Sequence, residues 1–409
     1  MASSPLSTLP PPVAHVLTPE EELCWLALRL VPGLGTRRSA QLLERFGGPQ
    51  AIFRADPNEL ETCGISGSVA RSIASGCSFD EASTQQELMR KAGAQLITVN
   101  DARYSDRLRE IFDPPPVLFA RGNVDLLSSV CLAVVGTRHP TTYGVAATER
   151  LSGDLARAGL TIVSGMARGI DTAAHRSCLA AGGYTIAVLG CGVDVVYPSE
   201  NRRLAAEIAA NGLILSEFPM ESTAFPQNFP IRNRIISGLS TGLLVVEGAQ
   251  YSGSGITAKL ALDQGRELFA VPGNITSKMS WGPNLLIKQG ARLIQDWNDV
   301  VVELPQPDQR RLIAAGRQRI LELEGEAGLE ASVEAAASNQ SEATQLAEPQ
   351  ARAARRVLQH LKLDATVHLD VLVDEIDDMS PSEIIASLFE LEILGLVRQQ
   401  PGRNFAKVW

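Results

Sequence analysis

The sequence predicts an α/β fold in which helices cover both faces of a parallel sheet and smaller, mainly helical parts flank it. Between residues 95 and 305, short apolar runs of strand length alternate with segments of helical pattern. The runs are apolar almost without interruption, as expected for strands buried on both faces. Residues 20–80 and 351–409 show mostly helical patterns instead. The 409 residues are enough for two or three domains.

The N-terminal part begins with a Pro- and Ser-rich stretch that lacks the pattern of a signal peptide, so we expect it to be disordered. Further on, Val31–Gly35 precedes a helix and resembles the hairpin of a helix-hairpin-helix unit, and Cys63–Gly67 resembles a second copy. Such hairpins often hold a DNA phosphate beside a basic residue, here Arg37 or Arg38. A small SAM-like helical packing module is the favoured alternative.

The central part predicts the sheet itself. Helix candidates such as Val145–Ala158 and Asp171–Ala181 lie between most of its strand candidates. This alternation is typical of an extended Rossmann-like parallel sheet, whose ligands bind beyond the carboxyl ends of the strands. The strand candidates are Gln95–Val99, Leu132–Val135, Thr161–Val163, Thr185–Leu189, Leu213–Leu215, Leu243–Val246, Leu268–Val271 and Arg292–Ile294.

The C-terminal part predicts a winged helix, with three helices followed by a hairpin of Val397–Gln399 and Phe405–Val408. Its third helix, Pro381–Leu394, would be the recognition helix of a DNA reader. That helix carries Glu383, Glu390 and Glu392 and no Lys or Arg, so it would repel phosphate. We therefore expect this module to bind protein, or to pack on its own chain or a second copy.

These patterns together divide the chain into five parts. The predicted parts are a disordered lead-in (1–19), a helical helix-hairpin-helix or SAM-like module (20–85), an extended Rossmann-like DNA-binding domain (86–305), an acidic linker (306–350) and a winged-helix domain (351–409).

Four Gly-rich turns each follow a strand candidate, and several carry an arginine. A Gly-rich turn between strand and helix exposes backbone N–H groups at a helix N-terminus, which favours an anion. One turn would suggest a nucleotide, whereas four with arginines between them predict a polyphosphate backbone. The turns are 135–138, 164–169, 189–194 and 247–255.

The densest group of candidate ligand residues is the segment Phe229–Ser240. Arg232 and Arg234 flank Asn233 near a predicted helix start, just after Phe229. Arginines supply charge and Phe229 a stacking face, a combination that suits single-stranded nucleic acid. The alternative is an arginine–carboxylate network with Glu217 or Glu247.

The sequence does not support catalysis or a cofactor. Val195 replaces the third glycine of a dinucleotide fingerprint, and Lys259 lies two residues beyond Thr257, where a Walker A loop would need it earlier. Asp171 and His175 share a helix face without a nucleophile, so a helix cap and a hydrogen-bonded histidine are favoured. Neither a metal site nor a disulfide framework is expected from six scattered cysteines, which suit a reducing cytoplasm.

The overall charge and hydropathy leave a nucleic-acid partner open. The net charge of −9 affects long-range attraction, but arginines of the nearly neutral central part can still form a local basic face. No apolar run approaches the ~18 residues of a membrane span, so we expect no membrane partner.

These segments together resemble the DNA-processing protein A (DprA/Smf) family of bacterial competence proteins. The resemblance implies a Rossmann-type fold that binds single-stranded DNA without cofactor or chemistry. It also implies a head-to-head homodimer that protects incoming transforming DNA and helps to load the RecA recombinase. The matching segments are Val135–Arg138, Ser164–His175, Leu189–Asn201, Phe229–Ser240, Ser252–Thr257, Gly265–Gly273, Gly282–Asn284 and the stretch up to Gly290-Ala291.

The sequence departs from the family at two positions. Ser199 follows the Tyr-Pro pair where family members often carry a basic residue, so we expect Arg202 or Arg203 to make that contact. Gly255 replaces an aliphatic residue. The residues assigned to nucleic-acid binding are Gly136, Thr137, Arg138, Ser164, Gly165, Arg168, Gly169, Asn201, Arg202, Arg203, Phe229, Arg232, Asn233, Arg234, Ser252, Gly253 and Ser254.

Two other function classes compete with this interpretation. A Rossmann-like nucleotide hydrolase, related to the phosphoribohydrolases, would need an acid/base glutamate beside the turns, and Glu217 and Glu247 are the candidates. A transcription regulator would rest on the winged helix alone and is disfavoured by its acidic third helix.

Overall fold

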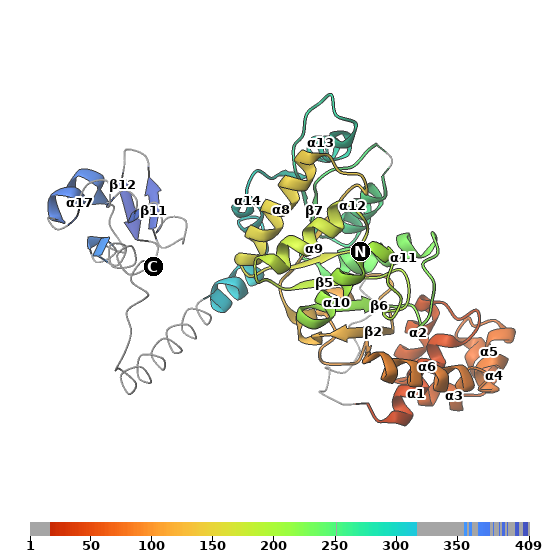
Figure 1. Cartoon of the computed structure of the whole chain (residues 1–409). Coiled ribbons are helices and arrows are strands. Elements are labelled where there is room, and N and C mark those ends of the chain that lie inside the picture. The colour runs from red at the N-terminus through yellow and green to blue at the C-terminus, as the bar shows by residue number, and fades with distance from the viewer. Residues whose placement is uncertain are drawn as a thin grey trace, which may run out of the picture. The chain divides into compact units, whose positions relative to one another are not determined.

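The computed structural model divides into two compact units, residues 1–324 and 325–409 (Figure 1). In the first unit it describes residues 17–250 and 252–316. In the second unit the described residues are 356–357, 360–361, 367–376, 379, 384, 387–388, 391, 397–400 and 404–407.

The first unit begins with a module of short helices. Thr18 accepts a hydrogen bond from the backbone of Glu21 and Glu21 reciprocates, a capping box that fixes the start of the first helix. Both predicted hairpins occur, one between α1 and α2 and one between α4 and α5. The helices are α1 (Pro19–Leu30), α2 (Thr36–Phe46), α3 (Pro49–Arg54), α4 (Pro57–Thr62), α5 (Gly67–Ala74) and α6 (Phe79–Ala92).

A nine-stranded sheet follows, in the order β1-β2-β6-β5-β4-β3-β7-β8-β9. The pairings from β6 to β9 along this order are parallel, as predicted, whereas β2 is antiparallel to both β1 and β6. The strands are β1 (Gln95–Thr98), β2 (Val117–Gly122), β3 (Cys131–Val135), β4 (Thr161–Ser164), β5 (Thr185–Val188), β6 (Leu213–Ser216), β7 (Gly242–Val245), β8 (Glu267–Ala270) and β9 (Arg292–Leu293).

Helices pack on both faces of this sheet. Along β3, Leu132 and Val134 belong to one apolar cluster, whereas Cys131, Ala133 and Val135 belong to another, so each face carries its own core. The covering elements are α7 (Asp106–Arg109), η1 (Val124–Ser128), α8 (Thr142–Arg157), α9 (Ile170–Ala180), η2 (Ser199–Asn201), α10 (Arg202–Asn211), α11 (Asn228–Leu239), α12 (Gly253–Asp263), η3 (Lys278–Ser280), α13 (Trp281–Lys288) and α14 (Trp297–Val301).

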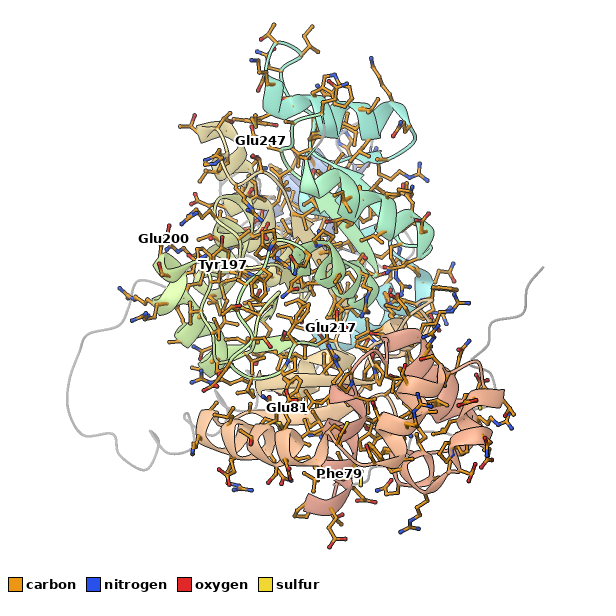
Figure 2. All side chains as sticks on the ribbon, turned by 90° about the vertical axis from the view of Figure 1, so that its right-hand side faces the viewer. Phe79, Glu81, Tyr197, Glu200, Glu217 and Glu247 are labelled. Atoms are coloured by element: carbon orange, nitrogen blue, oxygen red, sulfur yellow. The ribbon has the colours of Figure 1, made fainter. Side chains whose placement is uncertain are left out.

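The strand order brings the four Gly-rich turns to one edge. Strands β5, β4, β3 and β7 are consecutive and parallel, so their carboxyl ends lie side by side. The chain reverses its direction of winding at β3, because β4 pairs on one side and β7 on the other. Such a switch point opens a crevice in α/β sheets. Figure 2 labels four residues that follow the carboxyl ends of strands: Tyr197 and Glu200 after β5, Glu217 after β6 and Glu247 after β7.

The helical module is held against the sheet domain by polar contacts. Gln85 of α6 donates to the Met220 carbonyl and accepts from its amide, at 3.4 and 2.7 Å. Arg29 of α1 donates from Nε to the Glu217 carbonyl at 3.2 Å. In Figure 2, Glu217 lies next to the helical module that carries Phe79 and Glu81.

The prediction that an acidic linker starts at residue 306 is wrong for its first part. Residues 306–316 are helical and pack on the sheet domain. Leu312 belongs to one apolar cluster of the sheet, and Asp308 is ion-paired to Arg107 and accepts from Thr241 Oγ1 at 2.7 Å. The sequence did not predict this helix, because the segment is mostly polar and its packing depends on contacts such as those of Leu312 and Asp308. The rest of the predicted linker lies outside the described residues.

The C-terminal unit contains a three-stranded sheet of order β10-β12-β11, with β10 (Val367–His368), β11 (Val397–Gln400) and β12 (Asn404–Lys407). The predicted hairpin is the antiparallel β11–β12 pair. The predicted second helix is α17 (Leu369–Glu375). The predicted third helix, with its three glutamates, lies largely outside the described residues. Among the helices that the structure describes, none is long and apolar enough to cross a membrane.

Candidate nucleic-acid interface

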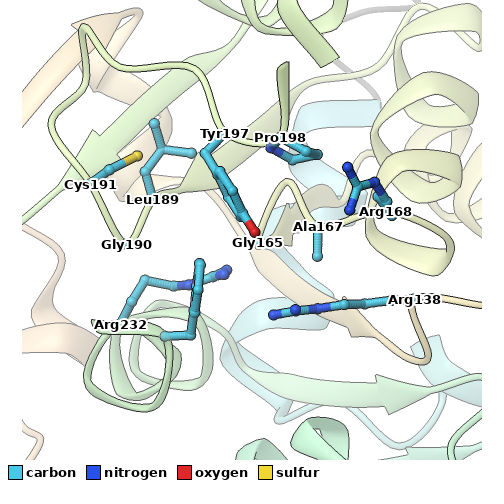
Figure 3. Close-up of a pocket in the computed structure, with 11 residues that line it drawn as sticks. Arg138, Gly165, Ala167, Arg168, Leu189, Gly190, Cys191, Tyr197, Pro198 and Arg232 are labelled. Atoms are coloured by element: carbon cyan, nitrogen blue, oxygen red, sulfur yellow. The ribbon is translucent and has the colours of Figure 1, made fainter. Parts of the chain in front are cut away.

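Three of the predicted turns and the start of α11 meet in one cleft of about 550 Å³ at the carboxyl edge of the sheet. A smaller hollow beside it, drawn in Figure 3, takes in residues of the second and third turns. In that view the Arg138 and Arg232 side chains converge below Tyr197. The predicted residues that line one or both are Gly136, Thr137, Arg138, Gly165, Arg168, Phe229, Arg232, Asn233, Ser252, Gly253 and Ser254.

Arg232 is the central charge of the site. It lies in α11, is only 4% exposed, and lines both the cleft and the smaller hollow. Its Nε and Nη1 atoms have no hydrogen-bond partner among the described residues. Burial lowers the pKa of Arg232 to about 10, which leaves the guanidinium charged at neutral pH. A buried cation with unpartnered donors that faces a cleft is suited to bind an anion.

The lack of a side chain at Gly165 makes room for the Arg232 guanidinium. A Cβ atom at position 165 would overlap the guanidinium atoms of Arg232, so any larger residue there would displace the arginine. Asp171 fixes the same turn, because its carboxylate accepts from the Gly165 and Ala167 amides at 3.1 and 3.3 Å. Burial raises the pKa of Asp171, and the nearby Arg232 opposes that shift.

These contacts correct, for three amides, the expectation that the first two turns offer their backbone N–H groups to a ligand. The Gly165 and Ala167 amides are bonded to Asp171, and the Thr137 amide donates to the Glu247 carbonyl at 2.8 Å. Asp171 also does not cap α9 in the expected manner, since it lies one residue inside the helix and Gly169 occupies the cap position. In these two turns the arginines therefore provide the positive charge.

Phe229 forms the aromatic centre of the cleft. The guanidinium carbons of Arg138 and Arg232 lie 5.2 and 5.8 Å from its ring centroid, and the Tyr197 ring is 5.7 Å away. The start of α11 is anchored because the buried Asn228 donates to the Gly190 carbonyl at 2.9 Å. An aromatic ring between two guanidinium groups can stack a base while the arginines bind the flanking phosphates.

Arg234, predicted to contact DNA, is instead a structural residue. Its side chain is 7% exposed and forms ion pairs with Glu217 at 2.5 Å and Asp113 at 3.2 Å. It also donates to the Asp113 carbonyl at 2.8 Å. The arginine–carboxylate network considered from the sequence is therefore correct for Arg234, and Arg232 does not take part in it.

Five other predicted residues also lie outside the lining of the cleft and the smaller hollow. Ser164 is buried and donates to the Val134 carbonyl at 2.7 Å, and Asn201 is buried and donates to the Met166 carbonyl at 2.9 Å. Their polar groups are used inside the fold. The remaining three are Gly169, whose positive φ of 77° and tight packing on Thr137 make it structural, and the exposed Arg202 and Arg203 at the start of α10.

Arg168 lines the smaller hollow but pairs with Glu200 at 2.6 Å, and both side chains are more than half exposed. A backbone hydrogen bond of Glu200 and, after it, the hydrogen bond from Arg168 lower the pKa of Glu200. Such exposed pairs are weak, so a phosphate can compete for this arginine.

The structure adds cleft residues that were not assigned from the sequence. The Tyr197 ring is tilted against that of Phe229, and Ile256 and Thr257 line the cleft from α12. Tyr197 could have been assigned from the sequence, because the Tyr197-Pro198 pair precedes a basic turn at the same edge of the sheet. Ile256 had no comparable signal, because a lone apolar residue at a helix start is as consistent with burial as with exposure.

The two carboxylates considered for acid/base catalysis are engaged elsewhere. Glu247 is buried and accepts from the Thr141 amide and hydroxyl at 2.9 and 2.6 Å, at the start of α8. Glu217 is buried and paired with Arg234. Both carboxylates therefore hold structure together.

His175 forms the predicted hydrogen bond, with Nδ1 2.6 Å from Thr185 Oγ1, and is fully buried. Burial and the nearby Arg232 lower its pKa from 6.5 to about 3. Below pH 6.5 the unfolded chain binds a proton that the folded chain does not, so stability falls as the pH drops from 6.5 toward 3. We expect this histidine to contribute a loss of about 1.4 kcal/mol per pH unit in that window.

Urea unfolding of the wild type and His175→Gln between pH 7 and 4 measures this effect. In the variant, the free energy of unfolding should depend on pH less steeply, by about 1.4 kcal/mol per pH unit, whatever its value at pH 7. His139→Gln, which changes an exposed histidine, is the matched control. Equal slopes in the wild type and His175→Gln would contradict the neutral buried state.

The fold and the site define a Rossmann-like protein whose arginine- and phenylalanine-lined cleft is suited to bind phosphate and a base. Comparison with known proteins identifies the family. The model of the family "DNA recombination-mediator protein A" matches residues 95–305, and that of the "DprA winged helix domain" matches residues 341–403. The chain belongs to the DNA recombination-mediator protein A (DprA/Smf) family.

Individual relatives agree with this assignment. Protein Smf of Synechocystis is 35% identical over 402 residues, which cover 95% of this chain and 99% of the relative. DNA processing protein DprA of Bacillus subtilis is 45% identical over 53% of this chain and 73% of its own. The crystal structure of DprA from Streptococcus pneumoniae matches with a TM-score of 0.63 and 35% identity, over 71% of this chain and 99% of that one.

Proposed function

We propose that this protein binds single-stranded DNA as a recombination mediator and catalyses no reaction on it. The observation that carries the proposal is Arg232, a nearly buried guanidinium with unpartnered donors in a cleft beside Phe229. The guanidinium of Arg138 also lies over the Phe229 ring, and Arg138 is exposed. Two positive charges therefore lie beside one stacking surface. This arrangement matches the alternation of phosphate and base in a single strand.

A single strand fits this site better than a duplex. Phe229 can stack only on a base whose face is free, and in a duplex the neighbouring base pairs cover that face. Neither Phe229 nor the two arginines is placed on a helix or ribbon that projects outward to enter a groove. Gly253, where a Cβ atom would meet nothing within 4 Å, lets the backbone of the strand approach the fourth turn.

The nucleotide hydrolase is not favoured by any feature of the cleft. Its two candidate carboxylates hold α8 and Arg234 in place, as described above. The DprA/Smf relatives instead support a role in DNA processing and recombination. On that basis we propose that the protein protects incoming DNA, helps to load RecA, and acts as a homodimer in the cytoplasm.

A fluorescence-anisotropy titration with single-stranded and duplex oligonucleotides, repeated over a salt series, tests the proposed function. The single strand should bind more tightly, with a slope of log affinity against log salt of about −0.7 for each phosphate neutralised. Arg138→Ala should reduce the magnitude of that slope by about 0.7, the contribution of one phosphate contact. The reduction should be the same for every base sequence tested, because the arginine binds phosphate.

Arg150→Ala is the matched control, since Arg150 is also exposed but lies in α8 away from the turns. Equal affinity for duplex and single strand, or an unchanged slope in Arg138→Ala, would overturn the proposed binding mode. The winged-helix fragment, residues 351–409, should bind duplex only weakly; strong binding would instead favour a transcription regulator.

A further inference from the structure

Phe112 is the most exposed aromatic side chain among the described residues, with 75% of its surface accessible. It lies on the segment between α7 and β2, at the junction of the sheet domain and the helical module. A single exposed apolar residue is ordinary. Its surroundings distinguish Phe112, because they hold its backbone in place and supply a cation to one face of its ring.

The backbone around Phe112 is fixed by buried contacts. Arg234 bonds both the carbonyl and the carboxylate of Asp113, at 2.8 and 3.2 Å. The buried Tyr104 hydroxyl donates to the Pro115 carbonyl at 2.9 Å. The segment also contains three consecutive prolines, 114–116, which restrict its conformation further. The exposed ring is therefore presented on a rigid segment.

A guanidinium group covers part of the Phe112 ring. Arg37 of α2 lies 4.9 Å from the ring centroid, much as Arg138 and Arg232 flank Phe229 in the cleft. Arg37 and its neighbour Arg38 are both exposed, directly after the first hairpin of the helical module. The carboxylate of Asp113 is paired with Arg234, which reduces the repulsion that it would exert on a phosphate.

The topology places Phe112 at the same edge of the sheet as the cleft. Strand β2 runs antiparallel to β6, and Phe119 pairs with Ser216, the last residue of β6. The start of β2 and the segment before it therefore lie beyond the carboxyl end of β6. Helix α11 connects the two places, since Phe229 lies at the cleft and Arg234, five residues or about 7.5 Å further along the axis, binds Asp113.

We propose that Phe112, Arg37 and Arg38 form a second stacking platform for the same single strand where it leaves the cleft. A base stacks on the open face of Phe112, and the two arginines bind the adjacent phosphates. The platform gives the helical module a part in DNA binding that its hairpin alone could not establish. This inference rests on the proposed function, since the cleft must hold the strand first.

Anisotropy titrations with oligothymidylates of about three and about twenty nucleotides test this inference, because a strand of about three nucleotides has no base to spare beyond the cleft, whereas the longer strand can occupy both places. Phe112→Ala should weaken binding of the longer strand about fivefold to tenfold and leave the shorter strand unchanged. Phe112→Tyr should restore the affinity. Arg37→Ala should reduce the salt slope by about 0.7 for the longer strand only.

Two matched variants serve as controls, and one positive variant separates the two hypotheses. Tyr184→Ala removes an aromatic ring that is 55% exposed but precedes β5, at the opposite edge of the sheet, and Arg150→Ala removes an exposed charge from α8. Neither should affect either strand. Phe229→Ala should weaken both lengths, because its ring is in the cleft.

The outcomes are distinguishable. If the wild type fails to bind a single strand, the proposed function is wrong. If Phe229→Ala weakens both lengths while Phe112→Ala changes neither, only the second platform is wrong. If Phe112→Ala weakens both lengths equally and lowers the urea midpoint, Phe112 only packs the helical module against the sheet domain, and the platform is again rejected.

Discussion

Arg232→Ala is expected to reduce the affinity for single-stranded DNA about tenfold to a hundredfold. Hydrogen bonds to charged groups contribute about 1.5–3 kcal/mol each, and this guanidinium has two donors without a partner among the described residues. Its loss also removes one of the two cations beside Phe229. Because the contact is to phosphate, the loss should be similar for all base sequences. Anisotropy titration at fixed salt measures it.

Gly165→Ala should give nearly the same loss without deleting any charge. The added methyl group would occupy the position of the Arg232 guanidinium and displace it from the cleft. Gly255→Ala, in α12, is the matched control, because a Cβ atom there meets nothing within 4 Å. Full binding by Gly165→Ala would show that the position of Arg232 is not what the strand requires.

Glu217→Ala is expected to lower the free energy of unfolding by about 3–5 kcal/mol. The change leaves Arg234, whose side chain is 7% exposed, without its buried partner. It also removes the charge that favours the ionised form of the partly buried Arg29, whose pKa burial lowers. Urea unfolding at pH 7 measures the effect.

Glu200→Ala is the control for that experiment, since it breaks an ion pair with Arg168 that is exposed on both sides. Its unfolding midpoint should equal that of the wild type. Glu217→Gln retains the shape of the side chain and should fall between the two. A Glu217→Ala protein as stable as the wild type would mean that water reaches the arginines and compensates them.

Much of the fold could be predicted because most of its strands are buried on both faces. All eight strand candidates correspond to strands. Seven of them are largely buried apolar runs, which have few other interpretations, whereas β9 is exposed. Strand β2 was missed because it follows three prolines and ends in Arg121 and Gly122, which favour a loop. Helix 306–316 was missed because only its Leu312 is apolar and packed.

The site was predicted less evenly, and helix geometry explains why. Phe229, Arg232 and Asn233 are three and four residues apart, so they share one face of α11 and line the cleft. Arg234 is two residues from Arg232 and must point to another side, where Glu217 and Asp113 meet it. The spacing could have separated the two arginines, but only the fold could identify the partners. The burial of Asn201 depended on long-range packing in the same way.

The carboxylate of Asp171, which binds the Gly165 and Ala167 amides, has a consequence for selectivity. Oriented amides would impose a fixed direction on each phosphate, whereas guanidinium groups and ring faces accept a range of approaches. Ribose and deoxyribose strands carry the same phosphates and base faces. This cleft should therefore tolerate RNA nearly as well as DNA, and the choice between them would fall to the compartment and the partners that deliver the strand.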